Sequence, residues 1–165
     1  MGDMLNRMDP YNMRALEMTP RLIEREIDRL GPENYDLKTD PNRFSAREGV
    51  CHLADWEPIM LARIKVGVET PGGRIQAYDE GQMALDHDYK SKDLKSELAR
   101  FKADRQKTIE YLSSLSKEDF SKTVMHPERG EMTVNDLAHM LVSHDVYHLE
   151  HLASMQPDEK AVDIW

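Results

Sequence analysis

The chain has 165 residues, 39% hydrophobic and 32% charged, a balance that fits one globular domain over residues 1–165 rather than a disordered chain. Its 22 basic and 31 acidic residues give a formal charge of −9, so we expect no nucleic-acid partner, because contacts to phosphate supply most of the affinity for a duplex. No run reaches the roughly 18 apolar residues of a membrane span, no signal peptide is visible and Cys51 is the lone cysteine, so we expect a cytoplasmic protein with no membrane partner.

The first predicted helix covers about Tyr11–Leu30, where apolar residues recur every three or four positions. Pro20 lies inside this stretch and predicts either a kink or a short lead-in before the main helix, with Thr19 as its N-cap. The Gly31-Pro32 pair ends the helix.

The second predicted helix begins with a capping box. Ser45 bonds forward into the first turn, and Glu48 reaches back to the backbone amide of Ser45. The helix continues to about Val66. Pro58 inside it predicts a local bend or a missing hydrogen bond.

A long loop is predicted over residues 69–89, with room for a short helix near Asp79–Leu85; loops of this length are often functional or long crossovers. The third predicted helix covers about Ser91–Leu115. Its repeat consists of Leu94, Leu98, Phe101, Arg105, Thr108 and Leu112. The fourth begins at Thr133 with a second box-like start and ends before Pro157. No stretch alternates cleanly as a strand does. Four helices with one long crossover predict an all-α four-helix bundle.

Histidines occupy the apolar stripe of the fourth helix. This stripe consists of Val134, Leu137, Leu141, His144, His148, His151 and Met155. His144 and His148 should therefore point into the bundle, where an unpaired imidazole would cost on the order of 1–3 kcal/mol. Because residues four apart lie on adjacent turns, one metal ion could bind both rings.

A third ligand must come from another element, and His52 on the second helix is the natural candidate. Three histidines would leave a coordination position open, as in catalytic rather than structural metal sites. The alternative is a set of buried histidines bonded to nearby carboxylates such as Asp145 or Glu150.

Two segments resemble motifs of the DinB-like (DinB/YfiT) superfamily. They are residues 45–57, SAREGVCHLADWE, and residues 133–149, TVNDLAHMLVSHDVYHL. The resemblance implies a four-helix bundle with a long crossover, a divalent metal held by His52, His144 and His148, and often a homodimer. It also implies kinship with thiol-dependent transferases and isomerases that use bacillithiol or mycothiol.

Four further residues are candidates for lining the pocket or supporting the ligands. Position 151 is commonly glutamine in the family, whereas His151 here could donate to a ligand, act as an acid or base, or bind the metal itself. Asp55 could orient a water or accept a hydrogen bond from an imidazole. Trp56 could form a wall of the pocket, and Tyr147 could line it.

These features predict a divalent-metal-dependent enzyme with a small-molecule substrate. We place thiol S-transfer first: zinc, nickel, iron or copper would bind a low-molecular-weight thiol such as bacillithiol or mycothiol and lower its pKa. A metal-dependent hydrolase would use the same ligands. Two alternatives belong to other classes, a non-catalytic metal- or small-ligand-binding protein of the stress response and an interaction module without metal.

Overall fold

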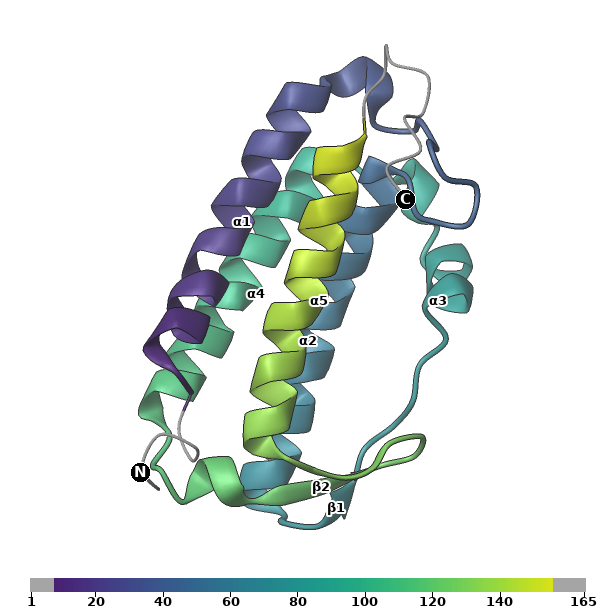
Figure 1. Cartoon of the computed structure of the whole chain (residues 1–165). Coiled ribbons are helices and arrows are strands. Elements are labelled where there is room, and N and C mark those ends of the chain that lie inside the picture. The colour runs from purple at the N-terminus through teal and green to yellow at the C-terminus, as the bar shows by residue number, and fades with distance from the viewer. Residues whose placement is uncertain (1–7, 156–165) are drawn as a thin grey trace.

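The computed structural model describes residues 8–155, most of which form helices (Figure 1). The helices are α1 (Pro10–Leu30), α2 (Ala46–Glu69), α3 (Glu80–Asp86), α4 (Leu94–Ser114) and α5 (Val134–Ser154). The strands are β1 (Gly73–Arg74), β2 (Thr123–His126) and β3 (Gly130–Thr133). Figure 1 shows α1 and α5 running in one direction along the bundle and α2 and α4 in the other. The predicted four-helix bundle with a long crossover is confirmed, and the crossover is what lets α2 and α4 run side by side in the same direction.

Capping side chains set where the helices begin. The Ser45 hydroxyl accepts from the Glu48 amide at 3.3 Å, and the Glu48 carboxylate accepts from the Ser45 amide at 2.9 Å, as predicted. Thr133 forms the equivalent box at the start of α5. Helix α4 begins later than predicted because the side chain of Asp93 accepts from the first turn.

Both interior prolines lie in unbroken helices. A proline has no N–H to donate to the carbonyl four residues earlier. In α1 the carbonyl of Leu16, which Pro20 leaves free, accepts from Nη1 of Arg105 at 3.1 Å. In α2 the corresponding carbonyl, that of Ala54, accepts from Nη1 of Arg100 at 3.1 Å. Two arginines of α4 therefore replace the bonds that the prolines remove, and α1 has no separate lead-in segment.

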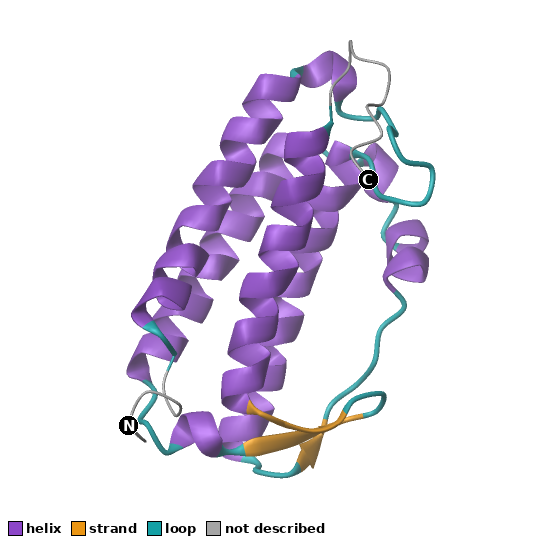
Figure 2. Ribbon diagram, in the orientation of Figure 1, coloured by secondary structure: helices purple, strands orange, loops and turns teal. Residues whose placement is uncertain are grey.

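A small sheet at one end of the bundle corrects the expectation of a purely all-α chain (Figure 2). Strand β2 pairs in parallel with β1 and antiparallel with β3. The strands are two to four residues long, too short for the alternation that marks a strand in sequence. The crossover, residues 70–93, connects the end of α2 to the start of α4. By pairing with β1, strand β2 attaches the start of this crossover to the hairpin that precedes α5.

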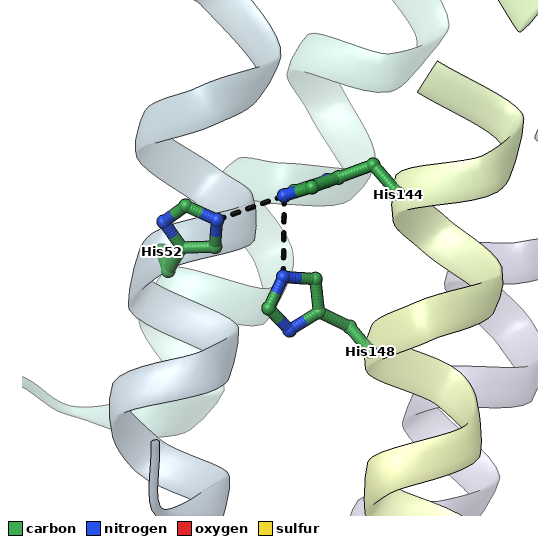
Figure 3. Close-up of side chains that lie close together, drawn as sticks. All are labelled: His52, His144 and His148. Atoms are coloured by element: carbon green, nitrogen blue, oxygen red, sulfur yellow. Dashed lines mark hydrogen bonds between the residues drawn. The ribbon is translucent and has the colours of Figure 1, made fainter. Parts of the chain in front are cut away.

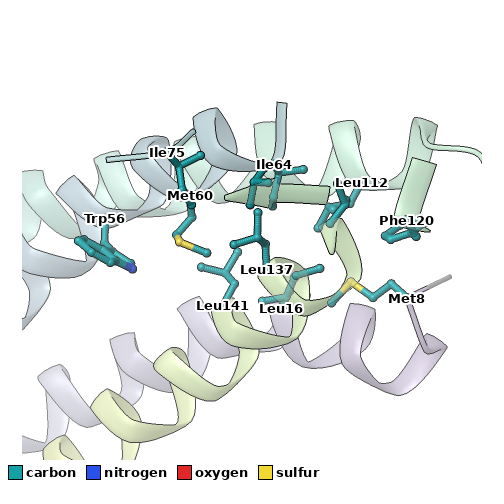
Figure 4. Packing of buried hydrophobic residues seen from close by; sticks show 13 residues of the cluster. Met8, Leu16, Trp56, Met60, Ile64, Ile75, Leu112, Phe120, Leu137 and Leu141 are labelled. Carbon is teal, nitrogen blue, oxygen red and sulfur yellow. The ribbon is translucent and has the colours of Figure 1, made fainter. Parts of the chain in front are cut away.

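Buried apolar side chains form two clusters along the bundle. The first lies toward the sheet and includes Leu16, Met60, Ile64, Leu112, Phe120, Leu137 and Leu141 (Figure 4). The second lies toward the opposite end and includes Ile23, Ile27, Val50, Leu53, Leu98, Phe101 and Leu152. On α1, α4 and α5, the buried polar residues Thr19, Arg105 and Asp145 lie between the residues of the two clusters. Glu57 of α2, next to Trp56, joins this level by accepting hydrogen bonds from Arg105. None of the helices within residues 8–155 is long and apolar enough to cross a membrane.

Candidate metal centre

Three histidine side chains meet where α2 faces α5 (Figure 3). His52 comes from α2, and His144 and His148 lie one turn apart on α5. The Nε2 atoms of His52 and His144 are 2.9 Å apart, and those of His144 and His148 are 3.2 Å apart. One ring nitrogen of each residue lies within 4.8 Å of the other two. The structure thus brings together the three residues that the sequence proposes as ligands.

The donor atoms of this group suit a divalent ion. Nitrogens about 2.0–2.1 Å from a tetrahedral zinc ion lie roughly 3.3 Å from one another, close to the measured separations. The Nδ1 atoms of His52 and His144 are buried and have no hydrogen-bond partner among the described residues. Asp145 and Glu150, the carboxylates considered as alternative partners, form ion pairs with arginines instead. The three rings therefore fit a shared cation better than separate bonds to carboxylates.

Burial keeps the three imidazoles neutral. Burial, reinforced by the neighbouring His144, lowers the pKa of His52 to about 3. Burial together with the charge of Arg105 lowers the pKa of His144 to about 4. Burial and the two adjacent rings lower the pKa of His148 to about 2. At neutral pH each ring keeps a lone pair, which is the form that binds metal.

A cavity of about 550 Å³ opens beside His144. Its apolar wall is formed by Trp56, Tyr78, Met132, Met140 and Tyr147. Its ionisable groups are those of Arg63, Glu80, His126, Glu128 and Arg129. The walls come from α2, the crossover, the β2–β3 hairpin and α5, so a molecule in the cavity would contact all four segments.

Glu80, the first residue of α3, places a carboxylate next to the three histidines. Its Oε2 lies 3.8 Å from Nε2 of His52, one of the nitrogens of the group. Sequence reasoning missed this residue. The only signal was the short helix predicted within a long loop, because nothing in the spacing shows where the crossover folds back onto α2.

A buried ion cluster lies next to the three histidines. Arg105, 1% exposed, donates to both carboxylate oxygens of Glu57, each at 2.8 Å, and to those of Asp145 at 2.6 and 2.9 Å. Burial alone would lower the pKa of Arg105, but the two carboxylates more than offset that effect and raise it. Glu57 follows Trp56 in sequence and Asp145 follows His144, so the cluster fixes the two helices that carry the candidate ligands. In the sequence, the position of Arg105 within the predicted repeat of its helix was the feature that could have indicated a buried arginine.

The family model described as the DinB superfamily matches residues 15–152. The chain belongs to the DinB superfamily.

Individual proteins also resemble the chain over most of its length. A protein of Oceanobacillus iheyensis named "Putative metal-dependent hydrolase" is 25% identical over 154 residues, which are 93% of this chain and 89% of that one. Bacillus subtilis YfiT, which carries the same description, is 22% identical over 144 residues, covering 87% of this chain and 81% of that one. The solved structure of YfiT matches with a TM-score of 0.81 at 22% identity, over 87% of this chain and 82% of that one, so the two share a fold.

Two of the remaining candidates in this DinB-superfamily chain line the cavity. The Trp56 ring stacks against the His144 ring at a centroid distance of 5.7 Å and an interplanar angle of 29°. Tyr147 is half exposed at the cavity edge, where the guanidinium of Arg43 lies 4.3 Å from its ring centroid.

The other two candidates lie outside the group of three. Asp55 accepts hydrogen bonds from His87 and Tyr89 and thereby anchors the crossover to α2. His151 is buried, and burial together with the charge of Arg43 lowers its pKa to about 4. It is not part of the candidate metal group, and its Nε2 has no hydrogen-bond partner within residues 8–155.

Proposed function

We propose that the chain is a metal-dependent hydrolase of small organic molecules. One observation carries the proposal: ring nitrogens of three neutral histidines converge beside a cavity large enough for a small substrate. His52 and His148 are buried, and the partly buried His144 lines the cavity. The names of the relatives, which describe metal-dependent hydrolases, support the same reaction class.

His52, His144 and His148 would hold the ion and leave at least one coordination position free. A divalent ion bound there would lower the pKa of a coordinated water and polarise a carbonyl group. Glu80, whose Oε2 lies 3.8 Å from Nε2 of His52, would accept the proton of an attacking water. Trp56, stacked on His144, would hold the apolar part of the substrate against the cavity wall.

Thiol S-transfer, the leading expectation from the sequence, would need the same three imidazoles. The names of the relatives describe hydrolysis and give thiol transfer no support. We therefore place hydrolysis first and use the thiol dependence of turnover to separate the two reactions.

The test combines metal content with turnover. Protein purified without a histidine tag should contain about one divalent ion per chain by elemental analysis. The metal-loaded protein should cleave members of a panel of small esters and amides without added thiol, and chelation should abolish turnover until metal is restored. Turnover that requires bacillithiol or mycothiol would contradict hydrolysis and favour transfer. Stoichiometric metal with no turnover under either condition would indicate a binding protein.

A further inference from the structure

Arg63 of α2 is a buried cation that lines the cavity, and no ion pair among residues 8–155 includes it. The residue is 5% exposed. Its Nη2 donates to the carbonyl of Gln76 at 2.6 Å, and its Nη1 lies 3.7 Å from Sδ of Met60. Its Nε is buried and has no hydrogen-bond partner among the described residues. Much of the donor capacity of this guanidinium is therefore unused.

The contrast with Arg105 shows how unusual this arrangement is within the molecule. Arg105 is even more deeply buried but forms two-pronged bonds with Glu57 and Asp145. Burial lowers the pKa of Arg63, whereas the carboxylates around Arg105 raise the pKa of that residue despite its burial. An unpaired buried charge lowers the stability of the folded chain, so folding alone does not account for an arginine at position 63.

Aromatic rings hold the Arg63 guanidinium at the cavity wall. Its Cζ lies 5.0 Å from the Trp56 ring centroid and 5.6 Å from that of Tyr78. The Trp56 ring also stacks on His144, so a single indole separates the guanidinium from the candidate metal ligands. A small molecule bound to Arg63 in the cavity would therefore lie close to His144, which lines the same cavity.

We propose that Arg63 binds the carboxylate of the substrate, so that the molecule hydrolysed is a small monocarboxylate with an apolar body. A guanidinium pairs with a carboxylate through two parallel N–H···O bonds. Two acidic side chains, Glu80 and Glu128, line the same cavity, and no hydrogen bond or ion pair within residues 8–155 joins either of them to Arg63. Their negative charges repel a phosphate dianion more strongly than a monocarboxylate. The assignment of the bond to be cleaved rests on the proposed hydrolysis, but the anion site itself does not.

Binding of matched probes tests the site without turnover. Benzoate, benzamide and phenyl phosphate are titrated by calorimetry into the metal-loaded protein and again after chelation, so that direct binding of oxyanions to the metal is removed. Benzoate should bind at least about tenfold more tightly than benzamide in both forms, since charge-assisted bonds are about twice as strong as neutral ones. Equal affinity for the two probes would overturn the proposal, and tighter binding of phenyl phosphate than of benzoate would replace the carboxylate with a phosphate.

Variants test whether Arg63 is the residue responsible for the preference for benzoate over benzamide. After chelation, Arg63→Met should lose the benzoate preference, and Arg63→Lys should keep only part of it because it retains the charge without the fork. Arg129→Gln removes the same charge from an exposed position of the same cavity and should keep the preference. A preference that survives in Arg63→Met, or that disappears in Arg129→Gln alone, would show that the site is wrongly placed.

Two further readouts separate folding and turnover from binding. Arg63→Met should unfold at a temperature no lower than the wild type in the absence of ligand, because it removes an unpaired buried charge; a marked loss of stability in both Arg63 variants would show a structural role instead. A wild-type protein that prefers benzoate but cleaves nothing would refute hydrolysis and leave the anion site standing. Cleavage of neutral and carboxylate-bearing esters with equal efficiency, without any benzoate preference, would refute the anion site alone.

Discussion

His52, His144 and His148 are uncharged at neutral pH because burial in the bundle penalises the imidazolium form of each ring. The same burial leaves nitrogen lone pairs with too few donors around them. Each ring therefore gains more from a shared cation than an exposed histidine would.

Replacing His144 should remove metal binding, because this ring contacts both of the others. We expect His144→Ala to weaken metal binding at least about a hundredfold, the upper end of what loss of a supporting partner alone can cost. His139→Ala is the matched control, since His139 lies on the same helix outside the group of three, with its ring bonded to the carbonyl of Asn135. Competition with a chromophoric chelator measures both affinities, and comparable losses in the two variants would contradict the assignment.

The metal-free protein should lose stability in acid through these rings. Their pKa values in the folded chain, about 2 to 4, lie below the ordinary value of 6.5, so the unfolded chain takes up protons first as the pH falls. Their contribution is complete above pH 6.5 and declines as the pH falls towards 4. Urea unfolding of chelated protein at several pH values should show a steeper decline for the wild type than for His148→Gln. Parallel curves would show that His148 is not buried and neutral.

At the scale of the helix, α1 and α2 tolerate interior prolines because α4 supplies donors at the corresponding levels. Arg105 serves the Leu16 carbonyl and Arg100 serves the Ala54 carbonyl. An interior proline ordinarily costs about 3 kcal/mol through the lost bond and its clash with the preceding turn. The arginine bonds replace the lost bond, and they also determine which helix lies beside each proline.

A double-mutant cycle between Pro58 and Arg100 tests this compensation. In Pro58→Ala the helix regains the N–H that can bond to the Ala54 carbonyl, so the arginine is needed less. We expect Arg100→Met to be less destabilising in the Pro58→Ala background by about 0.5–1.5 kcal/mol, the net value of one hydrogen bond. The bonds from Arg100 to Asp55 and Glu97 cancel in the cycle. Additive effects in denaturant unfolding would contradict the compensation.

The helices could be predicted from sequence because each satisfies a local rule. The three- to four-residue spacing of apolar side chains and the boxes at Ser45 and Thr133 locate α2 and α5 to within a few residues. The strands could not be predicted, because Gly73–Arg74 becomes a strand only through its pairing with Val124 and Met125, some fifty residues away. Local spacing carries no information about such a pairing.

At the scale of the whole molecule, one polar layer divides the apolar interior into two clusters. Arg105 contacts three other helices at this level, through Leu16 of α1, Glu57 of α2 and Asp145 of α5. These bonds fix how far α2 is displaced along its axis relative to α5. That displacement determines whether His52 lies next to His144 and His148.

Removing the central cation should destabilise the bundle strongly. Arg105→Met leaves Glu57 and Asp145 buried without a partner, and loss of one member of a buried ion cluster typically costs about 3–5 kcal/mol. Adding Glu57→Gln and Asp145→Asn to this variant should recover a large part of the loss, because no unpaired charge then remains. Chemical denaturation measures both effects. A triple variant that is no more stable than Arg105→Met would show that packing, rather than charge, is responsible.

The three histidines of the candidate site could be proposed from sequence because each lies on a long helix whose buried face is periodic. Glu80 and Arg63 could not be assigned roles, because their proximity to the site depends on where the crossover lies against α2. The homodimer, the thiol and the cytoplasmic location expected at the outset stay predictions.

The β1–β2 pairing has a consequence for how such a protein can diversify. It joins the crossover, which carries Tyr78 and Glu80, to the hairpin, which carries His126 and Met132. These two segments form the part of the cavity wall that does not come from α2 or α5. Substitutions at Tyr78, His126 or Met132 would alter which guest molecule fits while leaving the helices that carry His52, His144 and His148 untouched. The shape of this part of the cavity could therefore be redesigned without moving the three histidines of α2 and α5.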